Sequence, residues 1–215
     1  MLADADALAR RAAELVAERA RAAVRRDGRF TFAVSGGRTP WAMLALLADE
    51  GMPWPETAIY QVDERVAPAG DPDRNLTRLL ASLPAGTGVT VREMPVERDD
   101  LEAAAREYER VLPPAFDLVH LGLGPDGHTA SLLPDDPVLD VRDRAVAVTR
   151  PYQGRRRMTL TYPALERARE ILWLVSGADK ADALRRLRSS DRSTPAGRVP
   201  SQNALVLADA AAAAL

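Results

Sequence analysis

Hydrophobic residues recur along the chain with two periods, one typical of helices and one typical of buried strands. Between residues 4 and 26, alanine, leucine and valine form one apolar stripe among arginine and glutamate, and Gly28 follows as a typical helix end. Short apolar runs then alternate with further helical stretches. This alternation predicts an α/β fold with an open, mainly parallel sheet and helices on both faces.

The same pattern places the individual elements. Strands are expected at residues 30–34, 57–62, 89–91, 116–122, 145–148, 157–161, 171–175 and 204–207. Helices are expected at residues 41–50, 73–83, 101–112, 163–169 and 178–187, with a short helical segment at 129–133. The length of 215 residues, without a visible linker or repeat, predicts one domain over residues 1–215.

Composition and charge exclude several classes of function. The net charge of −2 offers no basic field for nucleic acid, and the absence of cysteine excludes disulfides, thiol nucleophiles and cysteine-bound zinc. No apolar stretch approaches the ~20 residues that a membrane span needs, and residues 1–28 lack the apolar core of a secretory signal. We therefore expect a cytoplasmic protein that binds neither nucleic acid nor membranes. No cluster of metal ligands is visible, and we expect neither a metal nor a cofactor.

Polar or glycine-rich segments follow four of the expected strands, at residues 35–39, 63–65, 122–128 and 176–180. In a parallel sheet these strand ends lie along one edge, so we expect the segments to meet at one crevice. Each segment is ambiguous alone. Residues 35–39 form either an anion-binding loop or a tight connection to a helix, and residues 63–65 alone are more typical of a solvated strand end. Their expected convergence favours a site.

Residues 122–128 carry the strongest local signal. They match the G-x-G-x-x-G pattern of dinucleotide sites, but they lie in mid-chain and lack the acidic residue expected about 20 positions later, which disfavours a nucleotide. His128 follows Asp-Gly at the expected crevice and suits a general base, although a histidine there can also cap a helix or bond a loop carbonyl. His120, inside the expected strand, is interpreted as a core histidine.

Two cationic residues extend the candidate site. Lys180 is the only lysine in a chain that otherwise uses arginine. This usage favours a position where a compact ammonium binds phosphate, and chance retention is the alternative. Arg157 opens an expected strand and is either a surface residue or a ligand-binding one.

Together these segments resemble the 6-phosphogluconolactonase family, within the glucosamine-6-phosphate isomerase/6-phosphogluconolactonase superfamily. The motifs are Ser-Gly-Gly-Arg-Thr-Pro at 35–40, Asp-Glu-Arg at 63–65 with a following Asn75, Leu-Gly-Leu-Gly-Pro-Asp-Gly-His-Thr-Ala-Ser-Leu at 121–132, Arg-Met-Thr-Leu-Thr at 157–161 and Gly-Ala-Asp-Lys-Ala at 177–181. They occur in the family's order, and the segment around Asp-Gly-His is the specific one. Arg38 departs from the family, which more often has a small polar residue there.

The resemblance implies a modified Rossmann-like fold that is shared with glucosamine-6-phosphate deaminases. In that branch, a run after Asp-Gly-His contains a glutamate that assists ring opening, whereas this chain has Thr129, Ala130 and Ser131. A lactonase is therefore favoured over a deaminase-like enzyme. A non-catalytic sugar-phosphate sensor on the same fold is a further alternative, disfavoured by His128 and by the lack of a DNA-binding pattern before residue 30.

The resemblance further implies hydrolysis of 6-phospho-D-glucono-1,5-lactone to 6-phospho-D-gluconate in the oxidative pentose phosphate pathway. His128 would act as general base on water, with Arg65 and Asp126 as the other catalytic residues. The residues expected to bind substrate are Ser35, Gly36, Gly37, Arg38, Thr39, Asp63, Asn75, Gly124, Gly127, Arg157 and Lys180. The expected partner is thus a small phosphosugar lactone, and we expect a monomer or a weak homodimer.

Overall fold

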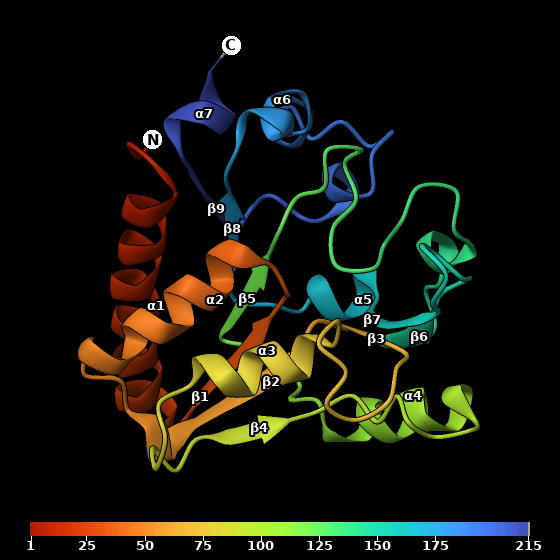
Figure 1. Cartoon of the computed structure of the whole chain (residues 1–215), viewed down its shortest axis with the longest axis horizontal. Helices are drawn as coiled ribbons and strands as arrows, with labels where there is room; N and C mark the ends of the chain where they lie inside the picture. Colours follow the sequence, from red (N-terminus) through yellow and green to blue (C-terminus); the bar gives the residue numbers. More distant parts are fainter. Residues whose placement is uncertain (215) are drawn as a thin grey trace.

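The computed structural model describes residues 1–214, and in this range it contains a six-stranded sheet whose neighbouring strands all run parallel (Figure 1). The order across the sheet is β4 (Thr90–Arg92), β2 (Thr57–Gln61), β1 (Phe30–Val34), β5 (Leu118–Leu121), β8 (Ile171–Val175) and β9 (Ala204–Ala208). The predicted α/β fold is confirmed. Strand β1 has β2 on one side and β5 on the other, so the strand order reverses there. Ligands of such sheets bind outside the carboxyl ends of the strands at this reversal.

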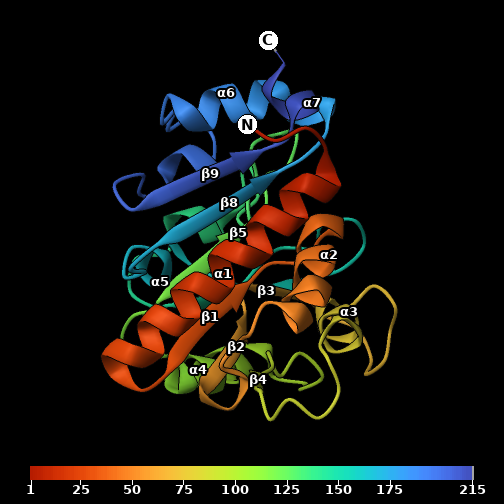
Figure 2. The same ribbon diagram turned by 90° about the vertical axis from the view of Figure 1, so that its left-hand side faces the viewer.

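Helices α1 (Ala5–Asp27) and α2 (Arg38–Leu46) cover one face of the sheet, and Figure 2 shows α1 in front of the sheet, lying along the direction of the strands. The Asp4 carboxylate caps the start of α1, and Gly28 ends it in the left-handed conformation with φ 72°. The buried alanines of α1 let the helix approach Phe30 and Phe32 of β1 closely. This core holds α2 against the carboxyl end of β1, beside α3 (Asn75–Ser82).

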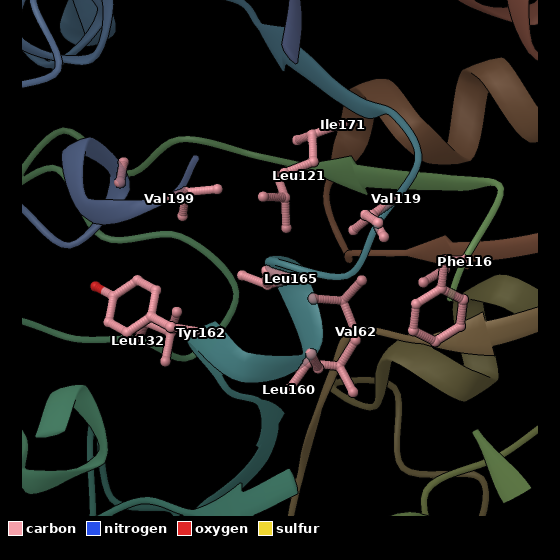
Figure 3. Close-up of a cluster of buried hydrophobic side chains, with 14 of the residues drawn as sticks. Val62, Phe116, Val119, Leu121, Leu132, Leu160, Tyr162, Leu165, Ile171 and Val199 are labelled. Carbon is pink, nitrogen blue, oxygen red and sulfur yellow. The ribbon is translucent and has the colours of Figure 1, made fainter. Parts of the chain in front are cut away.

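A second core fills the opposite face, beneath a separate antiparallel sheet of β3 (Asp63–Arg65), β7 (Arg157–Leu160) and β6 (Val146–Val148). Helices α4 (Leu101–Val111) and α5 (Tyr162–Leu165) adjoin it. Figure 3 shows part of this core, in which Val62, Phe116, Val119, Leu121, Leu160 and Leu165 gather. The sequence predicts the strands of this small sheet at 145–148 and 157–161, but not their pairing with residues 63–65.

Shorter helices complete the described chain. Helix α6 (Ala181–Arg188) follows β8, and α7 (Ala210–Ala213) follows β9. Single 3₁₀ turns lie at Leu47–Asp49, Trp54–Glu56, Pro137–Asp140, Ala178–Lys180 and Ala196–Arg198. Between residues 1 and 214, no helix is both long and apolar enough to cross a membrane.

The prediction of a short helix at residues 129–133 is wrong. In the described chain, Thr129 and Leu132 form an isolated bridge, closed by a 2.9 Å hydrogen bond from the Leu132 N–H to the Thr129 carbonyl. Ala130 has φ 52°, which a right-handed helix does not allow. The Thr129 hydroxyl donates to the Gly122 carbonyl at 2.8 Å, and the Ser131 N–H donates to Thr159 Oγ1 at 3.2 Å. These tertiary hydrogen bonds replace the helical ones.

Two further predictions differ from the structure near the strand ends. The helix predicted at 41–50 begins earlier, at Arg38, because Gly37 already serves as its N-cap. Residues 63–65 are not a solvated strand end, since Asp63 is 5% and Glu64 is 0% exposed. The Glu64 carboxylate accepts hydrogen bonds from the Asn75 and Leu76 N–H groups, both at 2.8 Å. It therefore caps α3 from outside that helix.

Candidate active site

The carboxyl ends of β1, β2, β5 and β8 surround a cleft of about 680 Å³. All four segments that the sequence places at strand ends contribute to its walls, and residues outside them, among them Asn75 and Arg157, complete the lining. The expected site residues that line it are Ser35, Gly36, Gly37, Arg38, Thr39, Asp63, Arg65, Asn75, Gly124, His128, Arg157 and Lys180. Asp126 and Gly127 do not line the cleft, and they instead help to position His128. We call residues 35–39 the first loop and residues 176–180 the second loop.

His128 is oriented by Asp126. Its Nδ1 lies 2.6 Å from Asp126 Oδ1, which also accepts the His128 backbone N–H at 3.1 Å. Partial burial by itself would raise the pKa of Asp126, but the hydrogen bonds and the charge of His128 outweigh it, so the pKa is lowered. Because an ionised carboxylate only accepts, Nδ1 carries a proton and Nε2 of the neutral imidazole is left to accept one.

Two glycines make room for this pair. A Cβ on Gly124 would lie 2.1 Å from His128 Nδ1, so no side chain fits there. Gly127 has φ 82°, and a Cβ on it would lie 2.8 Å from Thr194 Cβ. The Gly127 carbonyl also accepts the Ala196 N–H at 2.9 Å. The glycines of this segment thus position His128.

The first loop leaves polar groups open at the cleft. Gly37 is the N-cap of α2, and within residues 1–214 no side chain caps this helix. Ser35 is 3% exposed, and its Oγ is buried with no hydrogen-bond partner in the same part of the chain. An uncapped helix start presents free N–H groups and a positive dipole end, and here a buried hydroxyl lies beside it. This combination can bind an anion.

Asn75 joins the first loop to the strand end that carries Arg65. A Cβ on Gly36 would lie 2.0 Å from Asn75 Oδ1, so the loop backbone and the carboxamide are in close contact. Asn75 Nδ2 donates to the Asp63 carbonyl at 2.9 Å, and Oδ1 accepts from Arg65 Nη1 at 3.1 Å. Arg65 Nη1 also donates to the Asp73 carbonyl at 2.6 Å. The Arg65 guanidinium is therefore held on the wall of the cleft.

Asp63 and Arg157 form a buried charged group in the same wall. The Asp63 carboxylate accepts the Ser131 hydroxyl at 2.8 Å. Burial raises the pKa of Asp63, opposed by this hydrogen bond and by the charges of Arg65 and Arg157. Burial lowers the pKa of Arg157, opposed by the Asp63 charge, and the guanidinium lies 4.9 Å from the Tyr152 ring centroid. Arg157 Nε is buried without a hydrogen-bond partner in the described chain, while the residue as a whole lines the cleft.

The second loop is closed by a carboxylate of the protein. Ser176 Oγ donates to Asp209 Oδ2 at 2.6 Å, and the Gly177 N–H donates to both Asp209 oxygens at 3.2 Å. Lys180 lines the cleft, with Nζ 3.1 Å from Asp179 Oδ2. This loop consequently offers the cleft an ammonium group.

Sequence reasoning missed the residues that support the site from outside, namely Glu64, Ser131, Tyr152 and Asp209. Glu64 and Ser131 lie within the motifs at 63–65 and 121–132 and could have been found there. Tyr152, whose ring centroid is 6.4 Å from that of His128, and Asp209 stand in segments without a local signal. Across residues 1–214, no group of three histidine, aspartate or glutamate side chains is placed to hold a metal ion.

The fold and the cleft define a class: an α/β protein whose cleft, at the reversal point of a parallel sheet, combines an uncapped helix start with a histidine–aspartate pair. Residues 3–207 match the family described as glucosamine-6-phosphate isomerases/6-phosphogluconolactonase. The chain belongs to this family.

Individual relatives and solved structures are similar over most of the chain. A 6-phosphogluconolactonase of Synechocystis is 38% identical over 82% of this chain and 79% of the relative. A 6-phosphogluconolactonase of Mycobacterium tuberculosis is 36% identical over 98% of this chain and 95% of the relative. The crystal structure of a 6-phosphogluconolactonase from Shewanella baltica superposes with a TM-score of 0.88 at 26% identity, covering 97% of this chain and 96% of that one.

Proposed function

We propose that this chain hydrolyses 6-phospho-D-glucono-1,5-lactone to 6-phospho-D-gluconate, a step of the oxidative pentose phosphate pathway. One observation carries the proposal: His128, paired with Asp126, lines the same cleft as the uncapped first loop. A phosphorylated lactone needs both parts, a base beside its ester carbon and an anion site at its phosphate. The names of the relatives support this choice. A monomer or weak homodimer in the cytoplasm stays a prediction.

The chemical step uses His128 as the base. A lactone is a cyclic ester, so water can attack C1 without a covalent enzyme intermediate. Nε2 of His128 takes a proton from that water, and Asp126 stabilises the resulting imidazolium through Nδ1. Arg65, held by Asn75, donates to the oxyanion that forms at C1. His128 then returns the proton to the ring oxygen as the C1–O bond breaks, which leaves a carboxylic acid and a free hydroxyl.

Binding of the phosphate positions C1. The free N–H groups at the start of α2 and the Ser35 hydroxyl donate hydrogen bonds to the phosphate in the first loop, with Arg38 beside them. Lys180 adds a cation from the second loop, and Arg157 adds one from β7. Anchoring the substrate at a distance from the reacting carbon holds C1 against the water and converts binding energy into rate.

The decisive experiment replaces His128 by asparagine. We expect kcat for the lactone to fall by about 10²–10⁴-fold with little change in KM, because general base catalysis is lost and the phosphate site is intact. The assay must be rapid, since the lactone also hydrolyses spontaneously. Circular dichroism and the melting temperature check that the variant is folded. Near-normal turnover by the variant, or release of ammonia from glucosamine 6-phosphate by the wild type, would contradict the proposal.

A further inference from the structure

His120 is a polar residue in an apolar position. It is 0% exposed in β5, and its partner in β8 is Leu172. Side chains alternate between the faces of a strand, so His120 shares its face with Leu118, which belongs to the core under α1 and α2. Among residues 1–214, His120 Nε2 has no hydrogen-bond partner. A buried donor without a partner destabilises a fold, and a leucine would avoid this cost. Packing alone therefore does not explain why this core position holds a histidine.

The other ring nitrogen contacts the first loop. The Ser35 N–H donates to His120 Nδ1 at 3.3 Å and to the His120 carbonyl at 3.3 Å. Ser35 is the residue at which β1 ends and the loop begins. The imidazole thus helps to set the direction in which the backbone leaves the sheet toward Gly36 and α2. Because the imidazole also accepts the Ser35 N–H, the N–H groups of the loop that stay free are those of the residues after Ser35.

This hydrogen bond requires a neutral imidazole, because Nδ1 must accept. Burial lowers the pKa of His120 to about 3, so the neutral form with its hydrogen on Nε2 persists around neutral pH. The two histidines of the chain therefore use Nδ1 in opposite ways. His128 donates from Nδ1 to Asp126, whereas His120 accepts at Nδ1 from the loop.

We propose that His120 is a positioning residue for the first loop: its Nδ1 orients the Ser35 N–H and thereby aims the N–H groups at the start of α2 toward the phosphate of the substrate. The identity of that phosphate rests on the proposed function. Anion binding by the loop does not, because inorganic phosphate alone can measure it.

The test compares His120→Leu with His120→Asn. Leucine removes both the acceptor and the unpartnered buried donor, whereas the Oδ1 of asparagine stands one bond beyond Cγ, as Nδ1 does in histidine. We expect His120→Leu to weaken the binding of inorganic phosphate on the order of five-fold in calorimetry, the factor set by one hydrogen bond. KM for the lactone should rise by a similar factor with little change in kcat. The melting temperature should stay equal or rise, and His120→Asn should restore phosphate binding.

Leu172→Val is the matched control on the neighbouring strand. It should lower the melting temperature and leave the affinity for phosphate unchanged, which separates loop positioning from general destabilisation. In NMR spectra, the imidazole resonances of His120 should not titrate between about pH 5 and pH 8.

Three results would overturn the inference about His120. They are wild-type phosphate affinity in His120→Leu, equal loss in His120→Leu and His120→Asn, and no binding of millimolar phosphate by the wild type. A wild type that binds phosphate through this loop but lacks lactonase activity would instead contradict the proposed function and leave the role of His120 standing.

Discussion

The two loops that contribute to the lining of the cleft begin with the same local sequence and differ in their hydrogen bonds. Each follows a parallel strand, each begins with Ser-Gly, and each leads into a helical segment. In the first loop, Ser35 Oγ and the N–H groups at the start of α2 have no partner within residues 1–214. In the second loop, Asp209 already accepts the Ser176 hydroxyl and the Gly177 N–H.

The difference shows how a protein leaves hydrogen-bond donors free at one helix start and satisfies them with its own carboxylate at another. The carboxylate of Asp209 accepts the hydrogen bonds of the Ser176 hydroxyl and the Gly177 N–H, so these donors of the second loop are already satisfied within the protein. The first loop has no such internal anion in the described chain, so a substrate phosphate can take that place. The second loop then contributes to the cleft through the side chain of Lys180. Each prediction below changes one side of this comparison.

Among changes within the two loops, the largest effect is expected from Gly36→Ala in the first loop. The new Cβ would lie 2.0 Å from Asn75 Oδ1, and Asn75 is itself held by hydrogen bonds to Asp63 and Arg65. Either the loop or the carboxamide must move, which displaces the proposed phosphate site and the proposed oxyanion donor Arg65 together. We expect kcat/KM to fall by about 10²–10³-fold, the loss typical of one oxyanion donor. Steady-state kinetics with the lactone measure this.

Gly122→Ala is the matched control for that change. Gly122 lines the same cleft, but no atom lies within 4 Å of a Cβ placed on it. Its kcat/KM should stay within a few-fold of the wild type. Comparable losses in the two variants would show that any added methyl group in the cleft is harmful, and that the contact between Gly36 and Asn75 is not special.

These loops also show which parts of the fold the sequence predicts. The central strands are buried on both faces, so they stand out as continuous apolar runs, and the parallel order then brings their polar ends together. Two strands of the small antiparallel sheet are predicted, but their pairing with residues 63–65 is not, because Asp63 pairs with Thr159, far away in the chain, and local patterns contain no such pairing. The helix at 129–133 was wrongly predicted for the same reason, because tertiary hydrogen bonds of Thr129 and Ser131 determine the conformation of that segment.

The candidate site divides in the same way. Residues at the strand ends, such as His128 and Lys180, could be predicted because topology alone collects them. Asp209 could not, because nothing in the sequence around it indicates that its carboxylate reaches back to Ser176 and Gly177. His120 was predicted as a core residue, and its burial confirms this, but the bond to Ser35 is visible only once β1 and β5 are paired.

A smaller effect is expected from Lys180→Ala in the second loop. Because Asp209 occupies the Gly177 N–H, the ammonium of Lys180 is the group of this loop that we propose to bind the phosphate. Its loss removes one charge-assisted hydrogen bond, so KM should rise about ten-fold or more with a smaller change in kcat. Lys180→Arg should keep part of the binding, since it keeps the charge. Unchanged KM and kcat in Lys180→Ala would place this lysine outside the site.

The smallest effect on catalysis is expected from Asp209→Ala, which opens the second loop. The carboxylate also caps α7 by accepting the Ala212 N–H at 2.7 Å, so its removal should lower the free energy of unfolding by about 1–2 kcal/mol. KM should rise only a few-fold, because Lys180 is displaced but still present. Asp100→Ala is the control, since Asp100 caps α4 by accepting the Ala103 N–H at 2.9 Å. Similar destabilisation without a change in KM is expected there.

The stability difference between the wild type and Asp209→Ala should depend on pH in a defined direction. Burial by itself would raise the pKa of Asp209, but hydrogen bonds from Ser176, Ala212 and Gly177 outweigh it, so the pKa is lowered in the folded protein. A lowered carboxyl pKa stabilises the fold above the unfolded value of about 3.9 and loses this effect as the pH falls through the folded value. Denaturant unfolding should therefore show the full difference at pH 7 and a shrinking one below about pH 4. A difference that stayed constant down to pH 2 would mean that the charge of the Asp209 carboxylate does not contribute to its hydrogen bonds with the second loop. The two loops would then differ only in the unpartnered Ser35 hydroxyl of the first loop.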